Sequence, residues 1–71
     1  MRFLKIRQVM ALTSLARPTI YKFIAEGRFP NQVKLGGNCV AWLEEEVLEW
    51  MNEKIEARDI RPRGTKDDVS Q

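Results

Sequence analysis

Histidine is absent from this 71-residue sequence, and cysteine occurs once, as Cys39. The missing imidazole removes the commonest general base and metal ligand, and a single thiol forms neither an internal disulfide nor a multi-thiolate metal site. A chain of this length buries only about 60% of its unfolded surface, which leaves little room for an enclosed pocket. We therefore expect no enzymatic activity, no metal or other cofactor, and no small-molecule substrate.

Long apolar runs are also missing. No stretch of about 18 apolar residues occurs, and the N-terminus lacks the pattern of a signal peptide. Both absences predict a soluble cytoplasmic protein without a membrane partner. If such a protein binds DNA, we expect it to associate with the bacterial nucleoid.

Charge is small in total but strongly segregated along the chain. The net charge is +2, a weak indication of a nucleic-acid partner by itself. Residues 1–42 nevertheless carry seven Lys or Arg side chains against one carboxylate, Glu26, whereas residues 43–56 carry six glutamates against one cation, Lys54. A polyanion would be attracted to the first segment and repelled by the second.

The segment from Arg17 to Glu26 predicts an amphipathic helix. At about 100° per residue, Ile20, Phe23 and Ile24 share one arc, which predicts a buried face. The opposite arc carries Arg17, Pro18, Tyr21, Lys22 and Ala25. This outward arc combines two cations with no carboxylate before Glu26, which suits a DNA groove.

A shorter helix and a tight turn precede this segment. Residues 3–6 suit a short strand or a lead-in, and residues 7–12 predict a helix of two turns whose buried side is Val9, Met10 and Leu12. The turn at residues 13–16 contains Leu15 as its apolar residue, a spacing typical of a helix-turn-helix. After the second helix, Gly27 is expected to supply the left-handed position that ends it.

Two apolar runs flank Gly36-Gly37-Asn38, which predicts a β-hairpin with a two-residue turn, either Gly-Gly or Gly-Asn. Either register places Val33, Leu35, Val40 and Trp42 on one face. With Lys34 behind its tip, the hairpin is expected to form a small basic wing.

A third helix is expected from Glu44 to about Ile55, with Trp42 and Trp50 in the core. The three glutamates at positions 44–46 suit its positive N-terminal end rather than a catalytic carboxylate pair. We thus predict one domain over residues 1–56 and a disordered tail of mixed charge over residues 57–71. The predicted fold is mainly α with a small hairpin, in the order helix, turn, helix, hairpin, helix, as in a winged helix-turn-helix.

Residues 3–55 resemble the AlpA family of prophage regulators. The resemblance rests on motifs in family-like order and spacing: Ile20-Tyr21, Gly27-Arg28-Phe29-Pro30, Leu35-Gly36-Gly37 and Ala41-Trp42. Three positions depart from the family pattern, because Ser14 replaces a common Gly, Ala16 a capping Ser, and Pro18 a small hydroxyl residue.

The resemblance implies a small winged DNA-binding domain of the wider MerR and excisionase group, with a helix in the major groove. Family members activate transcription of prophage or genomic-island genes, or act as recombination directionality factors that assist an integrase in excision. The implied partners are double-stranded DNA, a tyrosine-type integrase and additional copies of the same protein.

The candidate DNA-binding residues lie on the second helix, the loop after it and the hairpin. Arg17 suits a guanine edge or a phosphate, Thr19 and Tyr21 suit hydrogen bonds to bases or phosphates, and Lys22 suits the backbone. Arg28 and Lys34 are expected to contact phosphates. The full set is Arg17, Pro18, Thr19, Tyr21, Lys22, Arg28, Lys34, Gly36, Gly37 and Asn38.

A protein-binding module is the alternative. In this interpretation an antirepressor-like protein uses the apolar stripe of the third helix, with Leu48 at its edge, and does not contact DNA. The sequence leaves open the choice between transcriptional activation and excision, the DNA target and the oligomeric state.

Overall fold

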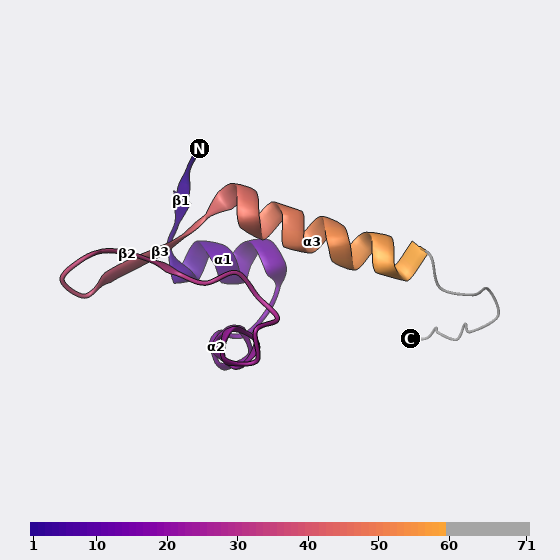
Figure 1. The fold of residues 1–71 in the computed structure, drawn as a ribbon, viewed down its shortest axis with the longest axis horizontal. Helices are drawn as coiled ribbons and strands as arrows, with labels where there is room; N and C mark the ends of the chain where they lie inside the picture. The colour runs from indigo at the N-terminus through magenta and orange to yellow at the C-terminus, as the bar shows by residue number, and fades with distance from the viewer. Residues whose placement is uncertain (60–71) are drawn as a thin grey trace.

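The computed structural model describes residues 1–59, which form three helices and a three-stranded antiparallel sheet (Figure 1). The elements in chain order are β1 (Phe3–Leu4), α1 (Ile6–Thr13), α2 (Arg17–Ala25), β2 (Val33–Gly36), β3 (Cys39–Leu43) and α3 (Glu44–Asp59). The sheet has the order β1-β3-β2, so the architecture is mixed α/β rather than mainly α with a single hairpin. No helix within residues 1–59 combines the length and the apolar character needed to cross a membrane.

The extra strand, β1, joins the N-terminus to the start of α3. Phe3 pairs with Leu43, and Leu4 pairs with Trp42. One residue earlier, the Arg2 carbonyl accepts the Glu44 N–H at 2.8 Å, and the Arg2 guanidinium donates to the Glu44 carboxylate at 3.1 Å. The sequence pattern did not reveal this pairing because two residues are too short for a strand periodicity.

The core lies around β3, the central strand. Ala41 and Trp42 point to opposite faces of the strand, yet they are only 1% and 0% exposed, so both faces are covered. The buried side chains that form one cluster come from every layer of the fold: Leu4, Val9, Ile20, Phe29, Trp42 and Val47. Every helix and strand except β2 therefore contributes one buried anchor, and Phe29 adds another from the loop before β2.

The predicted buried side of helix α1 is confirmed in part. Val9 is fully buried and Met10 packs against the core, as expected. Leu12, however, is 37% exposed and was wrongly placed in the core. Ile6 also packs inward and, with Val9 and Met10, turns the buried side of α1 away from Leu12.

Helix α3 is longer than predicted. It continues to Asp59, so residues 57–59, expected in the tail, are helical. The apolar periodicity ends earlier, but no Gly or Pro interrupts the helix-forming sequence before Pro62. Leu48 and Ile55 on this helix are 45% and 48% exposed. The remainder of the predicted tail, residues 60–71, lies outside the described residues.

Candidate nucleic-acid interface

Helix α2 begins with an unassisted cap. Ala16 has the extended backbone of an N-cap, and its carbonyl accepts the Ile20 N–H at 3.1 Å, but it offers no side-chain oxygen. Pro18 lies in the first turn, where its missing N–H leaves no intrahelical bond unmade. Arg17 and Pro18 are exposed as a result, at the end of the helix nearest the α1–α2 turn.

The two faces of α2 follow the predicted arcs with one exception. Ile20 is fully buried, while Phe23 and Ile24 pack against the core. Lys22 is exposed on the opposite side. Tyr21 was expected to point outward, but it is half-buried and also contacts the core.

Tyr21 packs against the central strand. Its ring meets the Trp42 ring edge-on, with centroids 6.3 Å apart and an interplanar angle of 63°. At about 100° from Ile20, Tyr21 lies on the flank of the helix, within reach of the large indole. The sequence-based arc treated this flank as fully outward, which is why the contact was missed. The ring joins α2 to β3, the second strand of the hairpin.

The C-terminal end of α2 is closed by a Schellman motif. Gly27 has a positive φ of 72°, the Arg28 N–H binds the Phe23 carbonyl at 2.8 Å, and the Gly27 N–H binds the Ile24 carbonyl at 3.0 Å. The left-handed Gly27 predicted from the sequence is confirmed. The motif turns the chain sharply toward the loop that leads to β2.

The Arg28 guanidinium is partly engaged inside the protein. It donates to the Glu26 carboxylate at 2.9 Å and lies 4.8 Å from the centre of the Phe23 ring. The Arg28 side chain is still 58% exposed. A phosphate would therefore compete with Glu26 for this guanidinium.

The β2–β3 hairpin has the predicted two-residue turn but an unpredicted bulge. Gly36 pairs with Cys39 around Gly37-Asn38, and the register then shifts so that Lys34 faces Val40. The shift leaves Leu35 as the extra residue of the bulge, 47% exposed, so the predicted single apolar face is wrong.

The hairpin tip relies on glycine for its backbone angles. Gly37 has a φ of 55° and Gly36 a φ of 135°, and nothing lies within 4 Å of a Cβ at either position. A side chain at position 36 would meet no neighbour, but a φ of 135° strains the backbone of any residue other than Gly. The tip and Lys34 are exposed.

Three predicted contact residues carry uncompensated positive charge. The ion pairs within residues 1–59 are Arg2–Glu44, Arg28–Glu26 and Arg58–Asp59. Arg17, Lys22 and Lys34 therefore pair with no carboxylate of this part of the chain. Because exposed cations of this kind attract phosphate groups, α2 and the hairpin are electrostatically suited to a polyanion.

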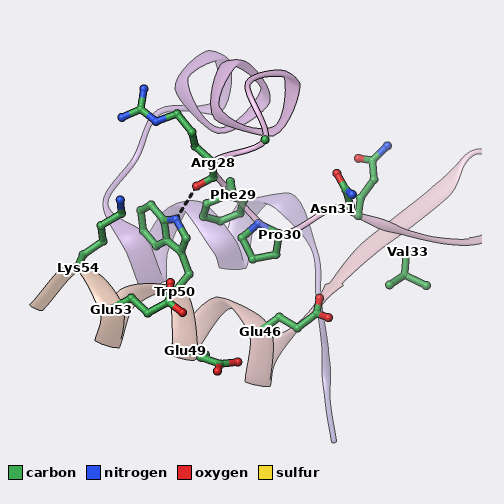
Figure 2. Close-up of a pocket in the computed structure, with 12 residues that line it drawn as sticks. Arg28, Phe29, Pro30, Asn31, Val33, Glu46, Glu49, Trp50, Glu53 and Lys54 are labelled. Carbon is green, nitrogen blue, oxygen red and sulfur yellow. Dashed lines mark hydrogen bonds between the residues drawn. The ribbon is translucent and has the colours of Figure 1, made fainter. Parts of the chain in front are cut away.

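A different surface lies between α3 and the loop before β2. An open groove of about 720 Å³ runs between residues 27–33 and α3 (Figure 2). Glu46, Glu49 and Glu53 line its α3 side. Carboxylates repel phosphate, so this groove does not extend the cationic surface.

Sequence reasoning placed Trp42 and Trp50 in the core and missed what their N–H groups do. The Trp42 indole donates to the Pro30 carbonyl at 3.1 Å, and the Trp50 indole donates to the Arg28 carbonyl at 2.7 Å. The N–H of a mostly buried Trp usually donates a hydrogen bond, so the sequence could have indicated that both indoles have an acceptor. Figure 2 shows the Trp50 indole beneath the loop, aimed at the Arg28 carbonyl.

The fold is a small mixed α/β domain, with a cationic helix and hairpin packed on one core. The family model described as "Prophage CP4-57 regulatory protein (AlpA)" matches residues 2–55. The chain belongs to this family.

The chain is also similar to two individual proteins, and the second of them carries the family's name. The chain is 53% identical over 57 residues to "Uncharacterized protein ORF88" of Enterobacteria phage P4, a match that covers 80% of this chain and 65% of the phage protein. It is 32% identical over 59 residues to "DNA-binding transcriptional activator AlpA" of Escherichia coli strain K12, covering 75% of this chain and 84% of that protein. The chain thus spans slightly less than two thirds of the length of the phage relative.

Proposed function

We propose that this protein binds double-stranded DNA and regulates genes of a prophage or mobile element. The observation that carries the proposal is the set of exposed cations Arg17, Lys22 and Lys34, which pair with no carboxylate of residues 1–59. Two elements joined to each other through the Tyr21–Trp42 contact present these cations. The relative from Escherichia coli, whose name describes a DNA-binding transcriptional activator, supports the same function.

The proposed mode of binding is that of a winged helix-turn-helix. Helix α2 enters the major groove, where Arg17 reads a guanine edge or grips a phosphate and Lys22 acts on the backbone. The hairpin tip at residues 36–38, with Lys34, lies as a wing against the backbone or the minor groove. Thr19 and Tyr21 supply hydroxyl groups near the groove floor or its phosphates.

Binding of this kind is strongly dependent on salt. Each phosphate neutralised by Lys or Arg contributes about −0.9 to the slope of log K against log[salt]. Arg17, Lys22, Arg28 and Lys34 together correspond to a slope of roughly −3 to −4 for one copy. Modest affinity for a single copy favours binding of several copies at adjacent sites.

The finer function we propose is regulation of transcription, excision, or both. In excision, the protein acts as a recombination directionality factor that bends DNA so that a tyrosine-type integrase is brought to its sites. A bacterial protein with this role works in the cytoplasm, associated with the nucleoid.

Footprinting tests the proposal on two duplexes, the attachment-site region and the promoter of the neighbouring integrase gene, at equal protein concentration. Protection of the promoter alone supports transcriptional regulation, and protection of the attachment site alone supports excision. The Arg17→Ala/Lys22→Ala double variant tests the proposed surface. Both side chains are exposed, so their loss should abolish protection without unfolding the protein. Protection that survives this double variant contradicts the proposed surface.

A protein-binding role for α3 is the second candidate. Leu48 and Ile55 are 45% and 48% exposed and, seven residues apart on one helix, share a stripe that fits a contact with an integrase or another copy. Substituting Leu48 and Ile55 by Ala separates the candidates. Loss of regulation with unchanged DNA affinity favours the protein contact, and loss of regulation only in the Arg17→Ala/Lys22→Ala variant favours DNA binding.

A further inference from the structure

The loop between α2 and β2 connects the helix to the hairpin, and the two elements also meet directly at the Tyr21–Trp42 contact. Residues 26–32 connect the last turn of α2 to the first residue of β2. If α2 and the hairpin bind one duplex together, their relative orientation must be fixed. If the orientation is wrong, the hairpin loses its DNA contacts when α2 is in the groove. The inference below rests on the DNA-binding function proposed above.

Two indoles hold this loop at the residues that come directly before and after Phe29. Phe29 is 6% exposed and meets the Trp50 ring edge-on, with centroids 4.8 Å apart. The carbonyl before Phe29, that of Arg28, accepts the Trp50 N–H at 2.7 Å, and the carbonyl after it, that of Pro30, accepts the Trp42 N–H at 3.1 Å. Trp42 belongs to β3 and Trp50 to α3, so the loop is fixed to two separate elements.

The Trp50 bond is the one that links the loop to a part of the fold outside the hairpin. Trp42 lies in the hairpin itself, and its N–H therefore relates the loop only to the adjoining strands. Trp50 lies on α3, whose start is tied to β1 by Arg2. The Arg28 main chain, and with it the end of α2, is thereby fixed against the body of the domain (Figure 2).

We propose that Trp50 is a positioning residue for DNA binding, which acts through its N–H on the Arg28 carbonyl and sets the geometry between α2 and the hairpin. Trp50 itself contacts no DNA in this account. The bond lies near solvent, so water can replace the lost donor and the domain stays folded without it. Without this bond the orientation of α2 relative to the hairpin is less fixed. The affinity for DNA falls because part of the binding free energy is then used to order the two elements.

The test is a double-mutant cycle between Trp50→Phe and Lys34→Ala, measured by fluorescence anisotropy on the duplex identified by footprinting. We expect Trp50→Phe to raise Kd about fivefold, an effect within the range of one lost hydrogen bond. Lys34→Ala should weaken the wild type about threefold but the Trp50→Phe variant far less, because a misoriented hairpin has little contact left to lose. Asn52→Ala, an exposed change on the same helix, is the control and should leave Kd unchanged.

A purely structural role for Trp50 gives another result. Partial unfolding reduces the active fraction by the same factor in both backgrounds, so Lys34→Ala would then cost the same with and without Trp50→Phe. That outcome, or an unchanged Kd for Trp50→Phe, overturns the inference.

If Trp50→Phe does not fold, 3-benzothienylalanine at position 50 is used in the same cycle. It keeps the bicyclic ring and replaces only the N–H, so the expected results are the same. A wild-type protein that binds no duplex overturns the proposed function itself.

Discussion

The rings of Tyr21 and Trp42 meet edge-on at 6.3 Å, which joins the cationic helix to the central strand of the sheet. Tyr21 is half-buried, whereas its neighbour Lys22 is exposed. The same side chain is thus a packing residue by its ring and a proposed DNA contact by its hydroxyl. These two roles are separable by substitution.

Tyr21→Phe and Tyr21→Ala should behave differently. Tyr21→Phe retains the ring contact with Trp42, so we expect unchanged stability and a loss of DNA affinity equivalent to about 1 kcal/mol if the hydroxyl binds DNA. Tyr21→Ala also removes a partly buried aromatic ring and should lower the free energy of unfolding by about 2–3 kcal/mol. Thermal denaturation and anisotropy measure the two effects. Equal affinity of Tyr21→Phe and wild type would assign Tyr21 to packing alone.

Glu26→Gln should strengthen DNA binding. Glu26 is the carboxylate that accepts the Arg28 guanidinium at 2.9 Å, and removing its charge frees Arg28 for phosphate and removes a repulsion. We expect Kd to fall about two- to fivefold at low salt, with a change in stability below about 1 kcal/mol because the pair is exposed. Glu45→Gln, an exposed change at the start of α3, is the matched control. Weaker binding by Glu26→Gln would contradict the assignment of Arg28 to phosphate.

Ser14→Gly should stabilise the protein. Ser14 ends α1 with a φ of 64°, a left-handed conformation that is unfavourable for most side chains, while its N–H binds the Met10 carbonyl at 2.8 Å. Gly adopts this conformation without the steric cost, so the free energy of unfolding should rise by roughly 0.5–1 kcal/mol. Chemical denaturation measures the change. Ser14→Ala keeps the conformational cost and is the informative comparison, since it should not stabilise.

Ala16→Ser should also stabilise the protein, for a different reason. Ala16 occupies the N-cap of α2 without any side-chain hydrogen bond. A Ser hydroxyl at this position can accept an orphan N–H of the first turn, worth about 1 kcal/mol. The gain should add to that of Ser14→Gly if the two caps act independently, which a double variant tests. Destabilisation by Ala16→Ser would show that the exposed cap is constrained by another contact.

The sequence predicted the structure correctly where local residue preferences decide the backbone conformation. Gly27 had to be left-handed after an amphipathic helix, and the structure places a Schellman motif there. The Gly-rich tip required a short turn, and the Gly37-Asn38 turn is present. The buried arc of α2 followed directly from the spacing of Ile20, Phe23 and Ile24.

Features that depend on tertiary contacts were not predictable in this way. The bulge at Leu35 changes register without a signature in the alternation of side chains, and β1 exists only because β3 offers it an edge. Tyr21 turned inward because an indole reaches its flank. The carbonyl partners of Trp42 and Trp50 are set by a loop path that no local pattern encodes.

The most direct test of the central claim, that α2 and the hairpin share one DNA-binding surface, is an NMR titration of the ¹⁵N-labelled protein with the footprinted duplex. The account predicts that amide shifts concentrate at residues 17–22 and 34–38, with little change along α3 beyond Trp50. Shifts confined to α3, or to only one of the two predicted segments, would contradict it.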